Sequence, residues 1–135
     1  MKRFDRIIPQ KTKRSENMTL KECYEALGGD YNDAMSRLYD ENFIKMFVLK
    51  FPEDKNYENL RKYLSENNHP EAFRAAHTLK GVSLNLSFST LADSCMALTD
   101  SLLSGIHPEA AALFDQVTKD YNMTVRAILK YKEQI

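Results

Sequence analysis

Residues 70–87 read PEAFRAAHTLKGVSLNLS, and their spacing predicts a helix with one side in a core. At about 100° per residue, one arc of this helix collects small and aliphatic side chains, and a second arc is polar. A third arc, roughly opposite the first, mixes apolar, cationic and imidazole groups with a glycine. The first arc holds Ala72, Ala75, Ala76, Leu79, Val82 and Leu86, the second Glu71, Arg74, Thr78 and Asn85, and the third Phe73, His77, Lys80, Gly81, Leu84 and Ser87.

Glycine and proline divide the rest of the chain into further apolar patterns of helical period. Thr19 and Glu22 have the spacing of a capping box, and two glycines follow the short helix that it would open. Ser89 or Thr90 can cap a later helix, and Pro108 suits the first turn of the last one. No segment alternates with period two, so we expect no strands. The expected helices span residues 19–27, 32–51, 54–66, 70–87, 89–104 and 108 to the C-terminus.

These helices predict an all-α fold, an antiparallel four-helix bundle with an additional short N-terminal helix. Two of the core helices would form one broken arm, and the helix at 19–27 would pack as a cap. The 135 residues suffice for one domain, which we expect at 18–135 behind a basic arm at 1–17. The arm carries a net charge of +4 and the remainder −4, so the chain is neutral overall. A solvated, mobile terminus is favoured over a partner-binding or nucleic-acid-binding arm, because no aromatic platform accompanies the charges.

Composition excludes several classes of protein. No apolar run approaches the roughly 18 residues of a membrane span, and the basic N-terminus lacks the apolar stretch of a secretory signal. Cys23 and Cys95 form neither a disulfide framework nor a zinc spacing. We therefore expect a soluble, cytoplasmic protein with free thiols, without nucleic-acid or membrane partners.

The third arc of helix 70–87 carries the candidate chemistry. A glycine inside a helix costs about 1 kcal/mol relative to alanine, and Gly81 stands one turn after His77. Either Gly81 permits close packing of another helix, or it clears space beside the imidazole for a partner. A neutral imidazole is a good nucleophile near pH 7 and forms covalent phosphoryl intermediates, beside which Lys80 could supply a cation. Phe73 and Leu84 would then dock a partner, although Phe73 could equally contact a neighbouring helix.

The stretch from Ala76 to Leu86 resembles the signature of histidine-containing phosphotransfer (Hpt) domains, His-x-Leu-Lys-Gly-x-Ser-x-Asn-Leu-Gly. The sequence departs from this pattern at Ser87, where the family usually has glycine, and this bears on capping of the helix end more than on phosphoryl chemistry. The helix order from about 20 to 132 also resembles a free-standing Hpt protein of the bacterial type. The matching positions are His77, Leu79, Lys80, Gly81, Ser83, Asn85 and Leu86.

The resemblance implies a covalent phosphoryl carrier of a two-component phosphorelay. His77 would accept a phosphoryl group from an aspartate of a response-regulator receiver domain and pass it to another receiver. Lys80 would lie near the phosphoryl group, Gly81 would leave room for the receiver, and Phe73, Leu84 and Ser87 would contact it. A hybrid sensor histidine kinase would feed the relay. No cofactor is expected on this chain, because the receiver would bring the Mg²⁺.

The motifs that are missing fit a carrier better than a stand-alone enzyme. The sequence has no Walker loop, no kinase glycine loop and no carboxylate cluster suited to Mg²⁺, which an ATP-dependent kinase would need. Two alternatives remain open. One is a helical protein-interaction module in which His77 is incidental. The other is a metal protein using His69, His77, Cys95 and His107, although no pair of them has metal-ligand spacing.

Overall fold

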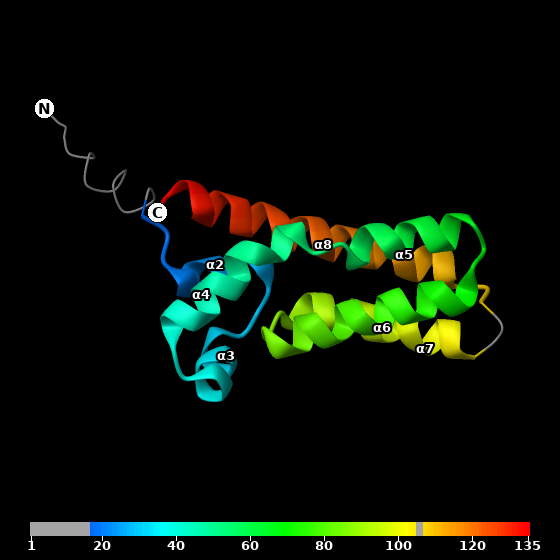
Figure 1. Ribbon diagram of the computed structural model, residues 1–135, viewed down its shortest axis with the longest axis horizontal. Coiled ribbons are helices and arrows are strands. Elements are labelled where there is room, and N and C mark those ends of the chain that lie inside the picture. Colours follow the sequence, from blue (N-terminus) through cyan, green and yellow to red (C-terminus); the bar gives the residue numbers. More distant parts are fainter. Residues whose placement is uncertain (1–16, 105–106) are drawn as a thin grey trace, which may run out of the picture.

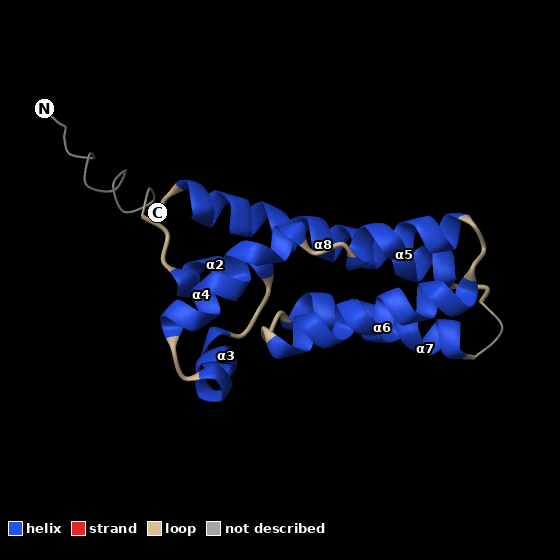
Figure 2. Ribbon diagram, viewed as in Figure 1, coloured by secondary structure: helices blue, strands red, loops and turns tan. Residues whose placement is uncertain are grey.

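The computed structural model describes residues 17–104 and 107–135, and every regular element in these ranges is helical (Figure 2). The predicted all-α class is confirmed. Apart from Asn17, the basic arm lies outside the described residues, as does the expected helix end at Gly105. The elements are α2 (Leu20–Leu27), α3 (Tyr31–Leu38), α4 (Glu41–Lys50), the 3-10 turn η2 (Phe51–Glu53), α5 (Asn56–Ser65), α6 (His69–Asn85), α7 (Ser89–Leu103) and α8 (Ala110–Glu133).

The long helices form a bundle in which α6 packs between α5 and α7, and α7 packs against α8 (Figure 1). Helix α4 leads into α5 through η2, so these two are the predicted broken arm, interrupted at Pro52. The Tyr57 ring of this arm stacks on Tyr121 of α8, with ring centroids 4.2 Å apart. Helix α2 packs on α8, and its Cys23 thiol lies 3.7 Å from the Ala127 carbonyl. None of the described helices is both long and apolar enough to cross a membrane.

The single helix predicted over residues 32–51 is wrong, because the chain turns at Tyr39 and starts again. Tyr39 adopts a left-handed conformation with φ of 65°, which ends α3. The Asp40 carboxylate then accepts from the backbone N–H groups of Asn42 and Phe43, capping α4. The break leaves α3 at the end of the bundle, beside α2 and α4 (Figure 1).

The capping box predicted for the first helix is confirmed. Thr19 accepts from the Glu22 N–H, and the Glu22 carboxylate accepts from the Thr19 N–H. Gly28 ends α2 in a left-handed conformation with φ of 78°, as expected. Thr90 does not cap a helix, since its hydroxyl donates to the Gly28 carbonyl at 2.8 Å. The end of α2 is thereby bonded to the start of α7.

Other helix starts differ in detail from the prediction, and α5 begins at Asn56 rather than at residue 54. Helix α6 begins at His69, capped by the Asn68 side chain, with Pro70 in its first turn. Ser89 is the first residue of α7 rather than its cap. Pro108 lies in the turn before α8.

The core-facing arc of α6 is buried as predicted except at one position. Val82 is only partly buried, whereas Ser83, which the wheel did not single out, is fully buried. Three small alanines let α6 approach its neighbours closely on this side. The buried members of the predicted arc are Ala72, Ala75, Ala76, Leu79 and Leu86.

Candidate functional site

The imidazole of His77 lies on the exposed side of α6. Its ring stacks on the Phe73 ring, with an interplanar angle of 11° and centroids 5.8 Å apart. No described residue forms a hydrogen bond or an ion pair with it. Since the opposite side of α6 carries the buried alanines, packing of the core holds His77 outward. A nucleophilic ring nitrogen is therefore open to a reactant from solvent or from a partner.

Gly81 leaves open space beside this imidazole. Apart from the backbone of its own helix, no described atom lies within 4 Å of the place where its Cβ would stand. The alternative reading, in which Gly81 permits close packing of another helix, is therefore wrong. Helical geometry puts Gly81 one turn after His77 on the same face. In the described part of the chain, no side chain beyond the two sequence neighbours of Gly81 reaches this space.

The other residues expected at this face differ in their exposure. Lys80, three residues after His77, is half-buried and forms no ion pair with a described residue. Leu84 is 46% exposed, which fits the expected contact with a partner. Phe73 is half-buried and also packs against the core, so its ring is shared between the core and the His77 face.

Ser87 does not lie on this face, and the expectation that it contacts a partner is corrected. Its side chain is 4% exposed and is held at the end of α6. The hydroxyl donates to the Asp33 carboxylate and accepts from the Arg37 guanidinium, both at 2.7 Å. The wheel misplaced Ser87 because α6 ends at Asn85, two residues before it.

An apolar groove of about 340 Å³ lies between α6 and the α3–α4 segment. Phe43 and Phe47 of α4 line it at an interplanar angle of 77° and are 43% and 40% exposed. Sequence reasoning missed this feature because it expected one uninterrupted core helix over residues 32–51. Asp40, whose carboxylate caps α4, was the signal in the sequence from which a second helix could have been predicted there. The remaining lining residues are Leu38, Val82, Asn85 and Leu86.

The cysteines and histidines assemble no second reactive centre in the described ranges. Burial raises the pKa of both the Cys23 and the Cys95 thiol to about 12, so neither forms a thiolate at neutral pH. His69 and His107 come together, with ring centroids 4.3 Å apart. No group of three or more potential metal ligands occurs among the described residues.

Comparison with known proteins places the chain in a family. The Hpt domain family matches residues 43–127. The matched range starts within α4 and ends within α8, so it contains α6 entire and leaves out α2 and α3. No curated protein and no solved structure matches the chain significantly.

Proposed function

Because the chain belongs to the Hpt domain family, we propose that its His77 accepts a phosphoryl group from a receiver-domain aspartate and passes it to a second receiver. The Hpt domain implies a phosphotransfer carrier in a phosphorelay. The observation that carries the assignment to His77 is the exposed, unbonded imidazole beside the open space at Gly81. The predicted domain bounds of 18–135 stay a prediction, since the family match covers a shorter range.

The transfer needs little from this chain. The unprotonated ring nitrogen of His77 attacks the phosphorus of the receiver's aspartyl phosphate, so an N–P bond forms and the acyl P–O bond breaks. The aspartate leaves as a carboxylate, and the proton on the other ring nitrogen passes to water. Lys80 supplies positive charge near the phosphoryl oxygens, and the Mg²⁺ that shields the transferring group belongs to the receiver. The return step to a second aspartate reverses these bonds.

The apolar groove supports docking of a receiver domain on the α3–α4 side of the histidine helix. Leu84 is exposed on the His77 face two turns after His77, and Phe43 and Phe47 of α4 line the groove itself. Half-exposed aromatic side chains are typical of the centre of a protein interface. The hybrid sensor kinase expected from the family would act through its own receiver domain at this surface.

Incubation with a panel of phosphorylated receiver domains tests the proposal. We expect the purified protein to remove the phosphoryl group from at least one receiver and to retain a label that is stable to base and labile to acid. The competing proposal, a helical interaction module without phosphotransfer, predicts binding to a receiver without any transferred label. Binding without transfer across the whole panel would therefore favour the interaction module.

A further inference from the structure

The histidine helix ends in a backbone arrangement that normally takes glycine. The Phe88 N–H donates to the Ser83 carbonyl at 2.8 Å, and the Ser87 N–H donates to the Leu84 carbonyl at 3.1 Å, which together form a Schellman motif. Ser87 occupies the left-handed position of this motif, with φ of 58°. A residue with a Cβ costs roughly 1–2 kcal/mol in this conformation. Something in the chain must therefore favour serine here.

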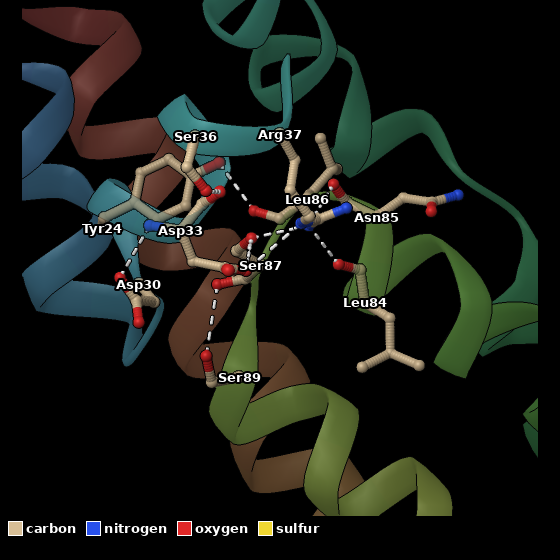
Figure 3. A network of polar contacts seen from close by, with 10 residues as sticks. All are labelled: Tyr24, Asp30, Asp33, Ser36, Arg37, Leu84, Asn85, Leu86, Ser87 and Ser89. Carbon is tan, nitrogen blue, oxygen red and sulfur yellow. Dashed lines mark hydrogen bonds and ion pairs between the residues drawn. The ribbon is translucent and has the colours of Figure 1, made fainter. Parts of the chain in front are cut away.

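The Ser87 hydroxyl takes part in a closed set of polar contacts with helix α3 (Figure 3). It donates to Asp33 Oδ2 and accepts from Arg37 Nη2, each at 2.7 Å. Arg37 Nε in turn lies 3.3 Å from the same Asp33 oxygen. A glycine would fit the backbone better but would lose both contacts. We call this set of three residues the clamp.

Arg37 also bonds the end of α6 directly. Its Nη2 lies 2.6 Å from the Leu84 carbonyl oxygen and 2.9 Å from that of Asn85 (Figure 3). Both carbonyls stand in the last turn of the helix, where a nearby cation is favourable. Arg37 is thus a cap supplied by one helix to the end of another.

The neighbouring carbonyls are bonded by the same part of the chain. The Tyr24 hydroxyl of α2 donates to the Leu86 carbonyl at 2.7 Å, and the Asp30 N–H donates to the Ser87 carbonyl at 2.8 Å. Four successive carbonyls, from residue 84 to residue 87, therefore accept from the α2–α3 segment. Residues 20–38 lie outside the range matched by the Hpt family, so these contacts come from a segment that the family match does not cover.

The clamp stands beside the apolar groove. Leu38, next to Arg37, lines one wall of the groove, and Asn85 and Leu86 line the opposite wall. Arg37 bonds the Asn85 carbonyl, so it joins the two walls to each other. A change in the clamp would let the walls separate without touching His77, which lies two turns earlier on α6.

We propose that Asp33, Arg37 and Ser87 fix the end of the histidine helix to α3 and so hold the groove in the shape that a receiver domain binds. This inference rests on the proposed phosphotransfer function. Arg37 is a positioning residue, which contacts neither the phosphoryl group nor His77. The Ser87 hydroxyl and then Arg37 hold the pKa of the Asp33 carboxyl below its ordinary value, so the carboxylate form is the one that the clamp favours.

Steady-state phosphotransfer from a phosphorylated receiver through this protein to an excess of a second receiver, which regenerates the free His77, tests the clamp in the variant Arg37→Gln. We expect KM for the receiver to rise about tenfold with little change in kcat, because binding is weakened and the chemistry is not. Chemical phosphorylation of His77 by phosphoramidate, which needs no receiver, should keep its wild-type rate. Arg74→Gln is the matched control. It removes an arginine that bonds Glu71 on the exposed surface of α6 at 3.0 Å. It should change neither KM for the receiver nor the rate of labelling by phosphoramidate.

Ser87→Gly is the second variant, because glycine keeps the left-handed turn and removes the hydroxymethyl side chain that joins the clamp. We expect a smaller rise in KM, about threefold, in a protein with unchanged helix content. A KM within twofold of wild type for Arg37→Gln in folded protein would overturn the clamp. Loss of phosphoramidate labelling in that variant would also overturn it, since the effect would then act on His77 itself. Failure of the wild-type protein to take a phosphoryl group from any receiver would instead overturn the proposed function.

Discussion

Gly81 follows His77 by one turn of α6, and apart from its own helix no described atom comes within 4 Å of where its Cβ would stand. Glycine lowers the stability of a helix interior by about 1 kcal/mol relative to alanine. No contact with another described helix offsets that loss. On the proposed function, this open space beside the imidazole is where the active site of a receiver would approach.

Replacing Gly81 with alanine should therefore change stability and activity in opposite directions. We expect Gly81→Ala to raise the free energy of unfolding by about 1 kcal/mol, because the added methyl group meets open space and favours the helix. The same methyl group should obstruct the receiver and slow phosphotransfer. Urea unfolding and a phosphotransfer time course measure the two effects.

Gly28→Ala is the contrasting variant for this prediction. Gly28 has φ of 78°, and a Cβ there would collide with the Thr90 hydroxyl. It should destabilise the protein by more than 1 kcal/mol. Equal stability changes at the two glycines, or a Gly81→Ala variant that transfers at the wild-type rate, would contradict the account of Gly81.

If the apolar groove is the docking surface, truncating a side chain that lines it should weaken receiver binding more than truncating an equally exposed side chain elsewhere. Phe43→Ala should raise KM for a receiver about tenfold, because an interfacial aromatic ring contributes more than 1 kcal/mol to binding when it is a central contact. Leu129→Ala on α8 removes an apolar side chain of nearly equal exposure, 44% against 43%, and should leave KM unchanged. Equal effects of the two truncations would show that the groove is not the docking surface.

The carboxyl of Asp33 predicts an acid-sensitive contribution to stability. Its pKa in the folded protein is lowered by the Ser87 hydroxyl first and by Arg37 as well. A lowered folded-state pKa means that this contribution is present above the unfolded-state value of about 3.9 and is lost as the pH falls through the folded-state value. Wild type should thus be more stable than Asp33→Asn at pH 7, and the difference should shrink towards pH 3.

Thermal unfolding of both proteins from pH 7 to pH 3 measures this convergence. Asp100→Asn serves as the control, since Asp100 is an exposed carboxylate on α7 that bonds no described residue. Its difference from wild type should stay near zero at every pH. A difference between wild type and Asp33→Asn that grows on acidification would contradict the bonding assigned to Asp33.

The two thiols should be inert in the folded protein. Burial raises the pKa of Cys23 and of Cys95 to about 12, with the nearby Asp120 adding to the shift at Cys95. At pH 8 a thiol reagent should modify neither cysteine in native protein and both in denaturant. Rapid modification of native protein would show that the α2–α8 or α7–α8 packing opens readily.

Much of the fold followed from periodicity and from residues that stop helices. Gly28 and the Thr19–Glu22 capping box act locally, so the two ends of α2 could be predicted from neighbouring residues. The break at Tyr39 was not, because a left-handed tyrosine is unusual and the apolar pattern continues across it. That one turn decides whether Phe43 and Phe47 face the core or the groove.

The sequence likewise predicted only part of the candidate site. The spacing of His77, Lys80 and Gly81 within one helix put them on one face, and α6 is a regular helix through all three. Ser87 was misplaced because a wheel does not show where a helix ends. Arg37 was missed because its contacts join residues 47 to 50 positions apart in the sequence, which only the tertiary fold brings together.

Transfer of a labelled phosphoryl group from a phosphorylated receiver to wild-type protein and to His77→Gln tests the central claim most directly. His69→Gln and His107→Gln are the matched controls, because they remove the other two histidines and leave α6 from Glu71 onward intact. We predict a base-stable, acid-labile label on wild type and on both controls, and none on His77→Gln. Equal labelling of His77→Gln, with its folding unchanged, would contradict the assignment of His77 as the phosphoryl acceptor.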